Sequence, residues 1–300
     1  MGRPGEVRVR VPGSSANLGP GFDTLGLALG LYDEVEVSVA AEGIEIEVSG
    51  EGAGRVPCDE AHLVVRAMRS AWDLVGDAPP GIRMRCHNAI PHSRGLGSSA
   101  AAAVAGATAA VALAGRDAEL ERDTILHVAA GMEGHADNAA ASLLGGFVVA
   151  WESAGNTSRR FHAVRLETHP GIHPVALVAG TESLTSTTRG LLPERVPLVD
   201  AAFTGSRTAL AVLAFTQRLE LLLPATEDRL HQNYRRPAYP ESAAMVDTLR
   251  DRGIPAAISG AGPTVLAITT DGILPPDLDL HGFTALALPV DGAGARVEIG

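Results

Sequence analysis

The sequence contains no lysine, because all 24 basic residues in the 300-residue chain are arginines. A Walker A phosphate-binding loop and the strand lysine of protein kinases each need a lysine at a fixed position, so both are excluded. Schiff-base chemistry is excluded for the same reason. Any cationic contact to a phosphate or a carboxylate must therefore come from arginine, histidine or a metal ion.

Cysteine and aromatic residues are also scarce. Cys58 and Cys86 form no CxxC pair for zinc binding or redox chemistry, and two isolated cysteines in a chain of this length suit a reducing compartment. We therefore expect a cytoplasmic protein. Aromatic residues make up 4% of the chain and hydrophobic residues 46%, so the core must consist mainly of Ala, Val, Leu and Ile.

The chain has no excess of positive charge. Its net charge of −11 argues against nucleic acid or an acidic membrane as the main partner, although a local anion site remains possible. The longest apolar run, 100–114, is rich in Ala, too short for a bilayer and interrupted by Gly106 and Thr108. A buried helix is the better interpretation of this run.

Strand and helix patterns alternate without the repeating rhythm of a doubly wound sheet, which indicates an α+β fold. We expect a turn-rich stretch over 12–26 and a hairpin formed by 34–39 and 44–48. The other expected strands are 7–11, 82–86, 147–151, 161–166, 175–178 and short ones near 256, 265 and 285, and the expected helices are 61–75, 101–115, 118–131, 196–222 and 242–251. The polar segment 152–160 divides the chain into predicted domains 1–155 and 156–300.

A Gly/Ser-rich loop, 91–101, joins a predicted strand to the Ala-rich helix. Gly95 and Gly97 allow close approach of the backbone to a ligand, and Ser98 and Ser99 can cap the helix and offer hydroxyls. Free N–H groups and the helix dipole make an anion site, in which each dipole interaction supplies only about 0.3–1 kcal/mol. The spacing is not GxGxxG, which argues against a dinucleotide-binding loop. The loop is expected to hold the phosphates of ATP, with an ordinary capped turn as the alternative.

Two further glycine-rich loops follow predicted strands, at 12–23 and 259–264. Each alone is best explained as a turn, in which Asn17 and Asp23 would cap backbone groups. Three such loops in one chain are harder to explain as turns.

Together the three loops resemble the three motifs of the GHMP small-molecule kinases, over nearly the whole chain. The run Ser-Ser-Ala-Asn-Leu-Gly-Pro-Gly-Phe-Asp at 14–23 is similar to the homoserine-phosphorylating members, as is Glu-Gly-His-Ala-Asp-Asn at 133–138. Mevalonate- and galactose-type members usually carry Lys or Arg where Ser14 stands here.

The resemblance implies a two-lobed α+β fold, with a ribosomal-protein-S5-like N-terminal lobe and a ferredoxin-like C-terminal lobe. The implied reaction is ATP-dependent phosphorylation of the hydroxyl of L-homoserine, giving O-phospho-L-homoserine in threonine biosynthesis, by direct in-line transfer with Mg²⁺. It also implies a homodimer. The alternatives are another GHMP alcohol kinase and a non-catalytic binding protein, which would lack the phosphate loop or the metal carboxylate.

The resemblance also assigns a catalytic set. Glu133 and the Ser98 hydroxyl are expected to hold Mg²⁺, which commonly takes one or two protein oxygens. Asn138 is expected near the reacting hydroxyl. Asp137 is expected to be structural, with a role as base as the alternative.

The substrate side is assigned in the same way. Asn17 and Asp23 are expected at the hydroxyl and ammonium of homoserine, with His135 lining the pocket. Arg189 and Arg235 are expected to hold the carboxylate, where each charge-assisted hydrogen bond contributes about 1.5–3 kcal/mol. The adjacent Arg236 is an alternative to Arg235.

The expected ATP-binding residues come from all three motifs and from the start of the first long helix. His62 stands where the homoserine-phosphorylating members often have an Asn facing the adenine, so base selectivity stays open. The full set is His62, Pro91, His92, Ser93, Arg94, Gly95, Leu96, Gly97, Ser98, Ser99, Ala100, Ala101, Gly260 and Gly262.

Overall fold

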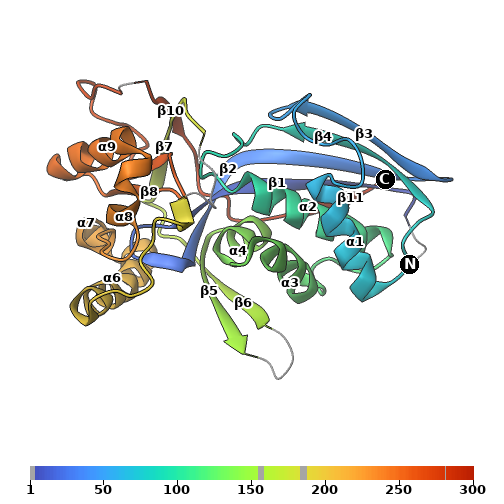
Figure 1. The fold of residues 1–300 in the computed structure, drawn as a ribbon, viewed down its shortest axis with the longest axis horizontal. Coiled ribbons are helices and arrows are strands. Elements are labelled where there is room, and N and C mark those ends of the chain that lie inside the picture. The colour runs from blue at the N-terminus through green and yellow to red at the C-terminus, as the bar shows by residue number, and fades with distance from the viewer. Residues whose placement is uncertain (1–3, 155–158, 183–187, 281) are drawn as a thin grey trace.

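The computed structural model describes residues 4–154, 159–182, 188–280 and 282–300. Its elements form two lobes, with the N-terminal half of the chain in one and most of the C-terminal half in the other (Figure 1). Both lobes combine a sheet with helices, which confirms the expected two-lobed α+β fold.

The first lobe is built on a seven-stranded sheet. Five strands follow the order β11-β1-β2-β4-β3, β5 pairs with β2, and β6 pairs with β5. Its strands are β1 (Glu6–Asn17), β2 (Gly21–Ala40), β3 (Gly43–Gly50), β4 (Gly81–Asn88), β5 (Phe147–Ala154), β6 (Arg159–Leu166) and β11 (Arg296–Ile299). Alternation decides the faces: Val7 and Val9 are buried, while Arg8 points outward to the carboxylate of Glu34 at 2.6 Å.

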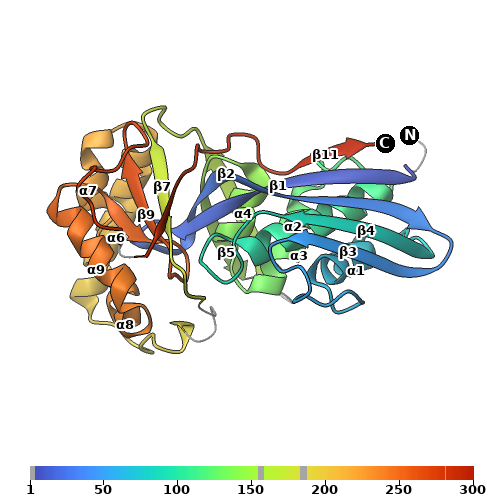
Figure 2. The same cartoon turned by 90° about the horizontal axis from the view of Figure 1, so that it is seen from above.

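Four helices cover the buried face of this sheet (Figure 2). They are α1 (Leu63–Val75), α2 (Ser98–Leu113), α3 (Arg122–Glu133) and α4 (Asp137–Leu144). The small side chains of α2 let it lie close to its neighbours: a Cβ added at Gly106 would be 2.3 Å from the carbonyl oxygen of Val64 in α1. Nearly all of α2 is buried, as expected for the Ala-rich run.

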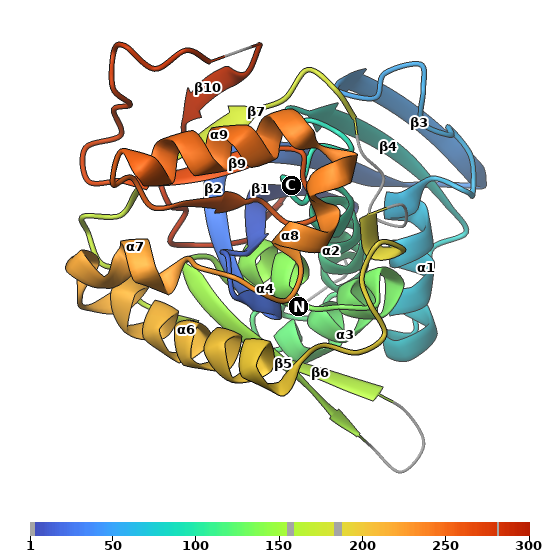
Figure 3. The same ribbon diagram turned by 60° about the vertical axis from the view of Figure 1, so that its left-hand side comes forward.

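The second lobe has a four-stranded antiparallel sheet with the order β10-β7-β9-β8. Its strands are β7 (His173–Val178), β8 (Ala256–Ile258), β9 (Val265–Thr269) and β10 (Thr284–Ala287), and its helices are α6 (Leu198–Thr216), α7 (Leu222–Ala225), α8 (Gln232–Arg235) and α9 (Pro240–Asp251). Figure 3 shows α9 lying across this sheet. A separate core, including Leu177, Leu249 and Val265, joins α9 to the strands.

The turn between β1 and β2 carries the first lobe into the second. Nε2 of His231 lies 2.7 Å from the carbonyl oxygen of Gly19, and the Thr208 hydroxyl donates to that of Pro20 at 2.9 Å. A Cβ at Gly19 would lie 2.4 Å from the carbonyl oxygen of Thr226, so only glycine allows this approach. The turn between Asn17, the last residue of β1, and Asp23, near the start of β2, is therefore fixed by both lobes.

Two expected features are wrong. The stretch 12–26 is not mainly turn, because β1 continues to Asn17 and β2 starts at Gly21, with bulges that re-aim the chain. The expected 34–39/44–48 hairpin does not form, because β4 lies between β2 and β3 and pairs in parallel with β3. The chain crosses over through α1 before it returns as β4, and local alternation carries no signal for that order.

The expected boundary between residues 155 and 156 lies outside the described residues. The flanking strands β5 and β6 pair with each other in the first sheet, and β11 returns to that sheet at the end of the chain. We therefore propose that the chain changes lobe between Leu166 and His173.

In the described part of the chain, α6 alone has the length and apolarity of a membrane span. Its Asp200 contacts Arg229 at 3.5 Å, and its Arg207 contacts Glu227 at 2.7 Å. Its Phe215 stacks on Phe147 of β5, with 5.1 Å between ring centroids. These contacts fit a helix of the second lobe that packs on the first.

Candidate active site

The start of α2 is open to an anion. Gly97 is the N-cap in the left-handed conformation, and no side chain caps the helix, so the expected capping by Ser98 or Ser99 is wrong. The first N–H groups of a helix have no intrahelical partner. Here they remain available, together with the positive end of the helix dipole, for the oxygens of a phosphate.

The three loops singled out by the sequence meet at this point. The amide N–H of Gly260 donates to the carbonyl of Ala16 at 3.0 Å, and the Ser259 hydroxyl donates to that of Gly95 at 2.6 Å. A Cβ on Gly95 would lie 2.3 Å from the carbonyl oxygen of Ser259. The loop at 259–264 therefore forms a floor beneath the phosphate loop.

Several expected ATP-binding residues support the loop instead of facing its cavities. The Arg94 guanidinium donates to the carbonyls of Ala179 and Gly180, at 3.0 and 3.3 Å, and so ties the loop to the end of β7. Gly262 packs against Tyr239. The side chains that turn into the core or away from the two cavities described below are those of Pro91, Leu96, Ala100 and Ala101.

Two cavities flank the phosphate loop and share Ser93, Ser98 and Ser99. The first, of about 250 Å³, lies between the lobes. The second, of about 260 Å³, lies beside α1 and includes His62 and His92. The loop thus stands between two compartments, as a phosphate donor and an acceptor would require.

The second cavity has an apolar side and a polar side, and its polar lining is Asp33, His62, Asn88, His92, Ser93, Ser98 and Ser99. Its apolar lining is Val56, Pro57, Ala61, Leu63, Val64 and Ala102. His62 is the N-cap of α1, where its Nδ1 accepts from the N–H of Val64 at 3.3 Å, and burial lowers the pKa of this imidazole. An apolar slot with a fixed polar group at its edge suits a flat ring.

Asp33, also on this cavity, was missed by the sequence analysis. Its Oδ1 accepts from the N–H groups of Ala89 and Ile90, at 2.8 and 2.9 Å, and so fixes the entry to the phosphate loop. Burial raises the pKa of this carboxyl to about 6, against the opposing effect of the two N–H groups. Only the crossover of the strands brings Asp33 here, so no local pattern could have found it.

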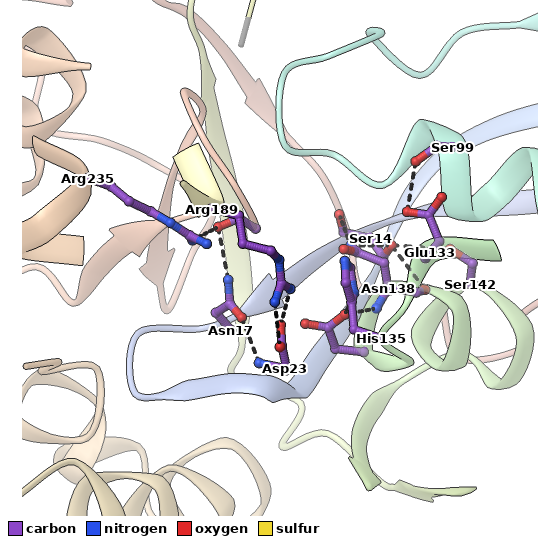
Figure 4. Close-up of polar contacts among 12 residues, drawn as sticks. Ser14, Asn17, Asp23, Ser99, Glu133, His135, Asn138, Ser142, Arg189 and Arg235 are labelled. Atoms are coloured by element: carbon purple, nitrogen blue, oxygen red, sulfur yellow. Dashed lines mark hydrogen bonds and ion pairs between the residues drawn. The ribbon is translucent and has the colours of Figure 1, made fainter. Parts of the chain in front are cut away.

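An ion pair between the lobes dominates the first cavity (Figure 4). Two nitrogens of Arg189 donate to the two carboxylate oxygens of Asp23, at 3.0 and 2.6 Å. Asn17 holds Asp23 in place, because its Oδ1 accepts from the N–H of Asp23 at 3.1 Å and its Nδ2 donates to the carbonyl of Gly260 at 2.9 Å. Residues 185–187, which precede Arg189 in its motif, lie outside the described residues.

Arg235 lies at the inner end of the same cavity and is only 1% exposed. Its polar contacts are long: 3.4 Å to the carbonyl of Thr188, 3.4 Å to Nδ1 of His231 and 3.5 Å to the carbonyl of Gly260. No carboxylate in the described part of the chain lies within ion-pair distance, and burial lowers the pKa of the guanidinium. Arg236 points elsewhere and pairs with Asp247, so the structure separates the two candidates.

His135 faces the cavity from the turn before α4. Its Nδ1 lies 2.7 Å from Oδ1 of Asp137, which also accepts from the N–H of Asn138 at 2.8 Å. Burial alone would lower the pKa of His135, but the hydrogen bond and charge of Asp137, with the charge of Asp23, outweigh it and raise the pKa. Asp137 is itself buried, in agreement with its expected structural role.

Comparisons with known proteins agree with this geometry. Family profiles described as GHMP kinases N terminal domain and GHMP kinases C terminal match residues 62–146 and 208–274. The homoserine kinase of Streptomyces coelicolor is 57% identical over 298 residues, covering 98% of this chain and 95% of that protein. The chain belongs to the homoserine kinases of the GHMP family. The homoserine kinase of Streptomyces avermitilis is 53% identical over 98% of this chain and 96% of its own length.

The fold agrees as well. The crystal structure of homoserine kinase from Cytophaga hutchinsonii superposes with a TM-score of 0.84, at 24% identity, covering 99% of both chains. The structural match confirms the expected two-lobed fold, and the family profiles and sequence relatives confirm the expected membership of the GHMP kinases.

In this homoserine kinase family member, the candidate metal ligands are hydroxyl oxygens at the start of α2 and the carboxylate of Glu133 at the end of α3. The Ser99 hydroxyl donates to Oε2 of Glu133 at 2.9 Å, and Ser98, the serine expected as a metal ligand, lines both cavities. Burial raises the pKa of Glu133, although the hydrogen bond from Ser99 opposes the shift. Carboxylate and hydroxyl oxygens next to a phosphate site fit the hard-oxygen preference of Mg²⁺.

A second group of possible metal ligands is already engaged. Ligand atoms of Asp23, His135 and Asp137 lie within 4.8 Å of one another. Asp23 is paired with Arg189, and Asp137 with His135. Glu133 is therefore the better candidate for the metal.

Proposed function

We propose that the chain transfers the γ-phosphoryl group of ATP to the hydroxyl of L-homoserine, giving O-phospho-L-homoserine in threonine biosynthesis. The observation that carries this proposal is the cavity between the lobes. It brings a carboxylate and two guanidinium groups beside the open N-terminus of a helix, which supports binding of an amino acid next to a phosphate.

The charges of the cavity match those of an amino acid. Arg235 is a buried cation without a carboxylate partner in the described part of the chain, a costly arrangement that an incoming anion would relieve. The α-carboxylate would bind Arg235 and Arg189, and the α-ammonium would bind Asp23. Since Asp23 and Arg189 pair with each other at 2.6 Å, the zwitterion would replace this one ion pair with three.

The nucleotide would lie across the loop, with its base in the apolar slot beside His62 and its phosphates at the N-terminus of α2. Glu133, with Ser98 or Ser99, would hold Mg²⁺. When bound, Mg²⁺ neutralises charge on the phosphate oxygens. The remaining ATP contacts would be made by backbone N–H groups, because Arg94 is engaged with carbonyls of the second lobe.

Transfer would be direct and in line, with no strong base. The carboxylate nearest to His135 and Asn138 is that of Asp137, whose Oδ1 already accepts two hydrogen bonds. The chain has no lysine to form an Asp–Lys pair. Positioning and charge neutralisation, which carry most of phosphoryl transfer in kinases, would therefore supply the rate.

The test is release of ADP by the purified protein with Mg²⁺ and ATP. L-Homoserine should support turnover at least about 100-fold better than mevalonate, galactose or shikimate, because only homoserine can satisfy both Asp23 and the two arginines. Turnover with one of the other alcohols and none with homoserine would replace the acceptor and leave the kinase assignment intact. The homodimer and the cytoplasmic location stay predictions.

A further inference from the structure

A buried pair of serine hydroxyls lies beneath Asn138 (Figure 4). Ser14 Oγ donates to the main-chain carbonyl of Asn138 at 3.3 Å and accepts from Ser142 Oγ at 3.2 Å and from Asn138 Nδ2 at 3.0 Å. Both serines are 0% exposed. Because a hydroxyl donates once and accepts twice, α4 saturates the hydrogen-bonding capacity of Ser14.

This environment fixes the orientation of the Asn138 amide. Nδ2 also lies 3.4 Å from the main-chain oxygen of Ser14, which can only accept a hydrogen bond. Turning the amide over would set Oδ1 against that oxygen and leave Ser14 Oγ with one donor fewer. Nδ2 therefore faces the protein.

The opposite atom, Oδ1, is left to the cavity. No hydrogen bond to it is made within the described residues, and Asn138 lines the cavity between the lobes. A Cβ built on Gly260, another lining residue, would lie 3.9 Å from this oxygen. Asn138 thus offers the substrate an acceptor and no donor.

An acceptor is the useful group at this place. In the transfer, the substrate hydroxyl oxygen bonds to the γ-phosphorus, the bond from phosphorus to the β,γ-bridging oxygen breaks, ADP leaves with that electron pair, and the hydroxyl proton is released to water. A hydroxyl that donates to Asn138 Oδ1 keeps its lone pairs free for phosphorus. An N–H donor would occupy one of them and oppose the attack.

Ser14 also contacts the phosphate loop. Its N–H donates to the carbonyl of Leu96 at 3.0 Å, and a Cβ at Gly97 would lie 2.2 Å from Ser14 Oγ and 3.0 Å from Asn138 Nδ2. The serine therefore packs between the N-cap of the phosphate-binding helix and the amide on the acceptor side.

We propose that Ser14 is a positioning residue for phosphoryl transfer, which holds Asn138 with its carbonyl oxygen toward the acceptor hydroxyl and at a fixed place relative to the phosphate loop. This inference rests on the proposed function. According to this proposal, the buried, neutral side chain of Ser14 affects turnover and not substrate binding.

The test is Ser14→Ala in the full chain, with steady-state kinetics for both substrates. We expect kcat to fall by about 10- to 100-fold, as for a misplaced catalytic group, with both KM values within about 3-fold of the parent. In an Asn138→Ala background the same substitution should change kcat by less than about 2-fold, because its effect passes through that amide. Thr269→Val, which removes a buried hydroxyl bonded to the carbonyl of His173 in the second sheet, controls for general loss of stability.

A second measurement does not depend on turnover. In the parent protein, the side-chain N–H protons of Asn138 should exchange slowly with solvent by NMR, and in Ser14→Ala they should exchange at least about 10-fold faster. An unchanged kcat in Ser14→Ala, or an equal loss in the Asn138→Ala background, would overturn the proposal. If the protein phosphorylates another alcohol and not homoserine, only the identity of the acceptor is wrong. The role of Ser14 is then tested by the same kinetic comparison with that alcohol.

Discussion

The two sides of the proposed active site are built in different ways. The phosphate side is one continuous segment, 91–101, whose contribution is mostly backbone N–H groups at an uncapped helix start. The amino-acid side gathers charged side chains from the start of β2, the turn before α4 and two places in the second lobe. Substitutions that add a side chain should therefore impair the phosphate side, and substitutions that remove a side chain should impair the amino-acid side.

The largest expected effect comes from adding one methyl group to the phosphate loop. Gly95→Ala would place a Cβ 2.3 Å from the carbonyl oxygen of Ser259, at a φ of +77°. We expect kcat/KM for ATP to fall by more than about 100-fold, because the backbone must shift away from the phosphates. Gly54→Ala is the matched control, since it has a φ of +71° and nothing within 4 Å. Equal losses in both variants would mean that strain alone, and not loop position, is responsible.

A smaller effect, on the other substrate, is expected from Arg189→Ala. The KM for homoserine should rise by about 10- to 100-fold, the value of one lost charge-assisted pair, with the KM for ATP within about 2-fold of the parent. Arg236→Ala is its control, because Arg236 pairs with Asp247 outside the cavity. An unchanged homoserine KM in Arg189→Ala would remove this residue from the site.

His62→Ala tests the nucleotide side, where His62 is the side chain expected to contact the base. We expect the KM for ATP to rise by about 3- to 10-fold, since the imidazole lines the slot and caps α1, while the homoserine KM stays within about 2-fold. A rise in both KM values would place the effect in the fold of the first lobe and contradict a specific contact with the nucleotide.

The smallest effect is a pH dependence confined to the amino-acid side. The pKa of His135 is raised above its ordinary value, so its positive charge is fully present below about pH 6.5 and is lost as pH rises through the raised pKa. Homoserine binding should strengthen by about 2- to 5-fold over that rise, because His135 lies beside Asp23, where the substrate ammonium would bind, and its competing positive charge disappears. His135→Gln should remove this dependence and leave the ATP KM flat. A dependence that persists in His135→Gln belongs to another group.

More of the phosphate side than of the amino-acid side could be predicted from the sequence. The loop at 91–101, the helix that follows it and the need for arginine all follow from contiguous residues and from the absence of lysine. The details of that helix start were less accessible: Gly97 replaces a serine as the cap, and Ser99 contacts Glu133. Those contacts depend on α3, which is placed only by packing.

What the sequence alone determined about this protein is its kind: a lysine-free kinase loop, a second and third glycine-rich loop, and a family resemblance that spans the chain. What only the tertiary structure decided is which side chains meet. Arg235 and Arg236 are neighbours in the chain, but successive residues of a helix point about 100° apart, so one enters the cavity and the other faces Asp247. The insertion of β4 beside β2, the approach of Asp33 to the loop and the contact of Ser14 with Asn138 all join distant segments. Local propensity has no access to such contacts, because burial and hydrogen bonding between distant segments select them.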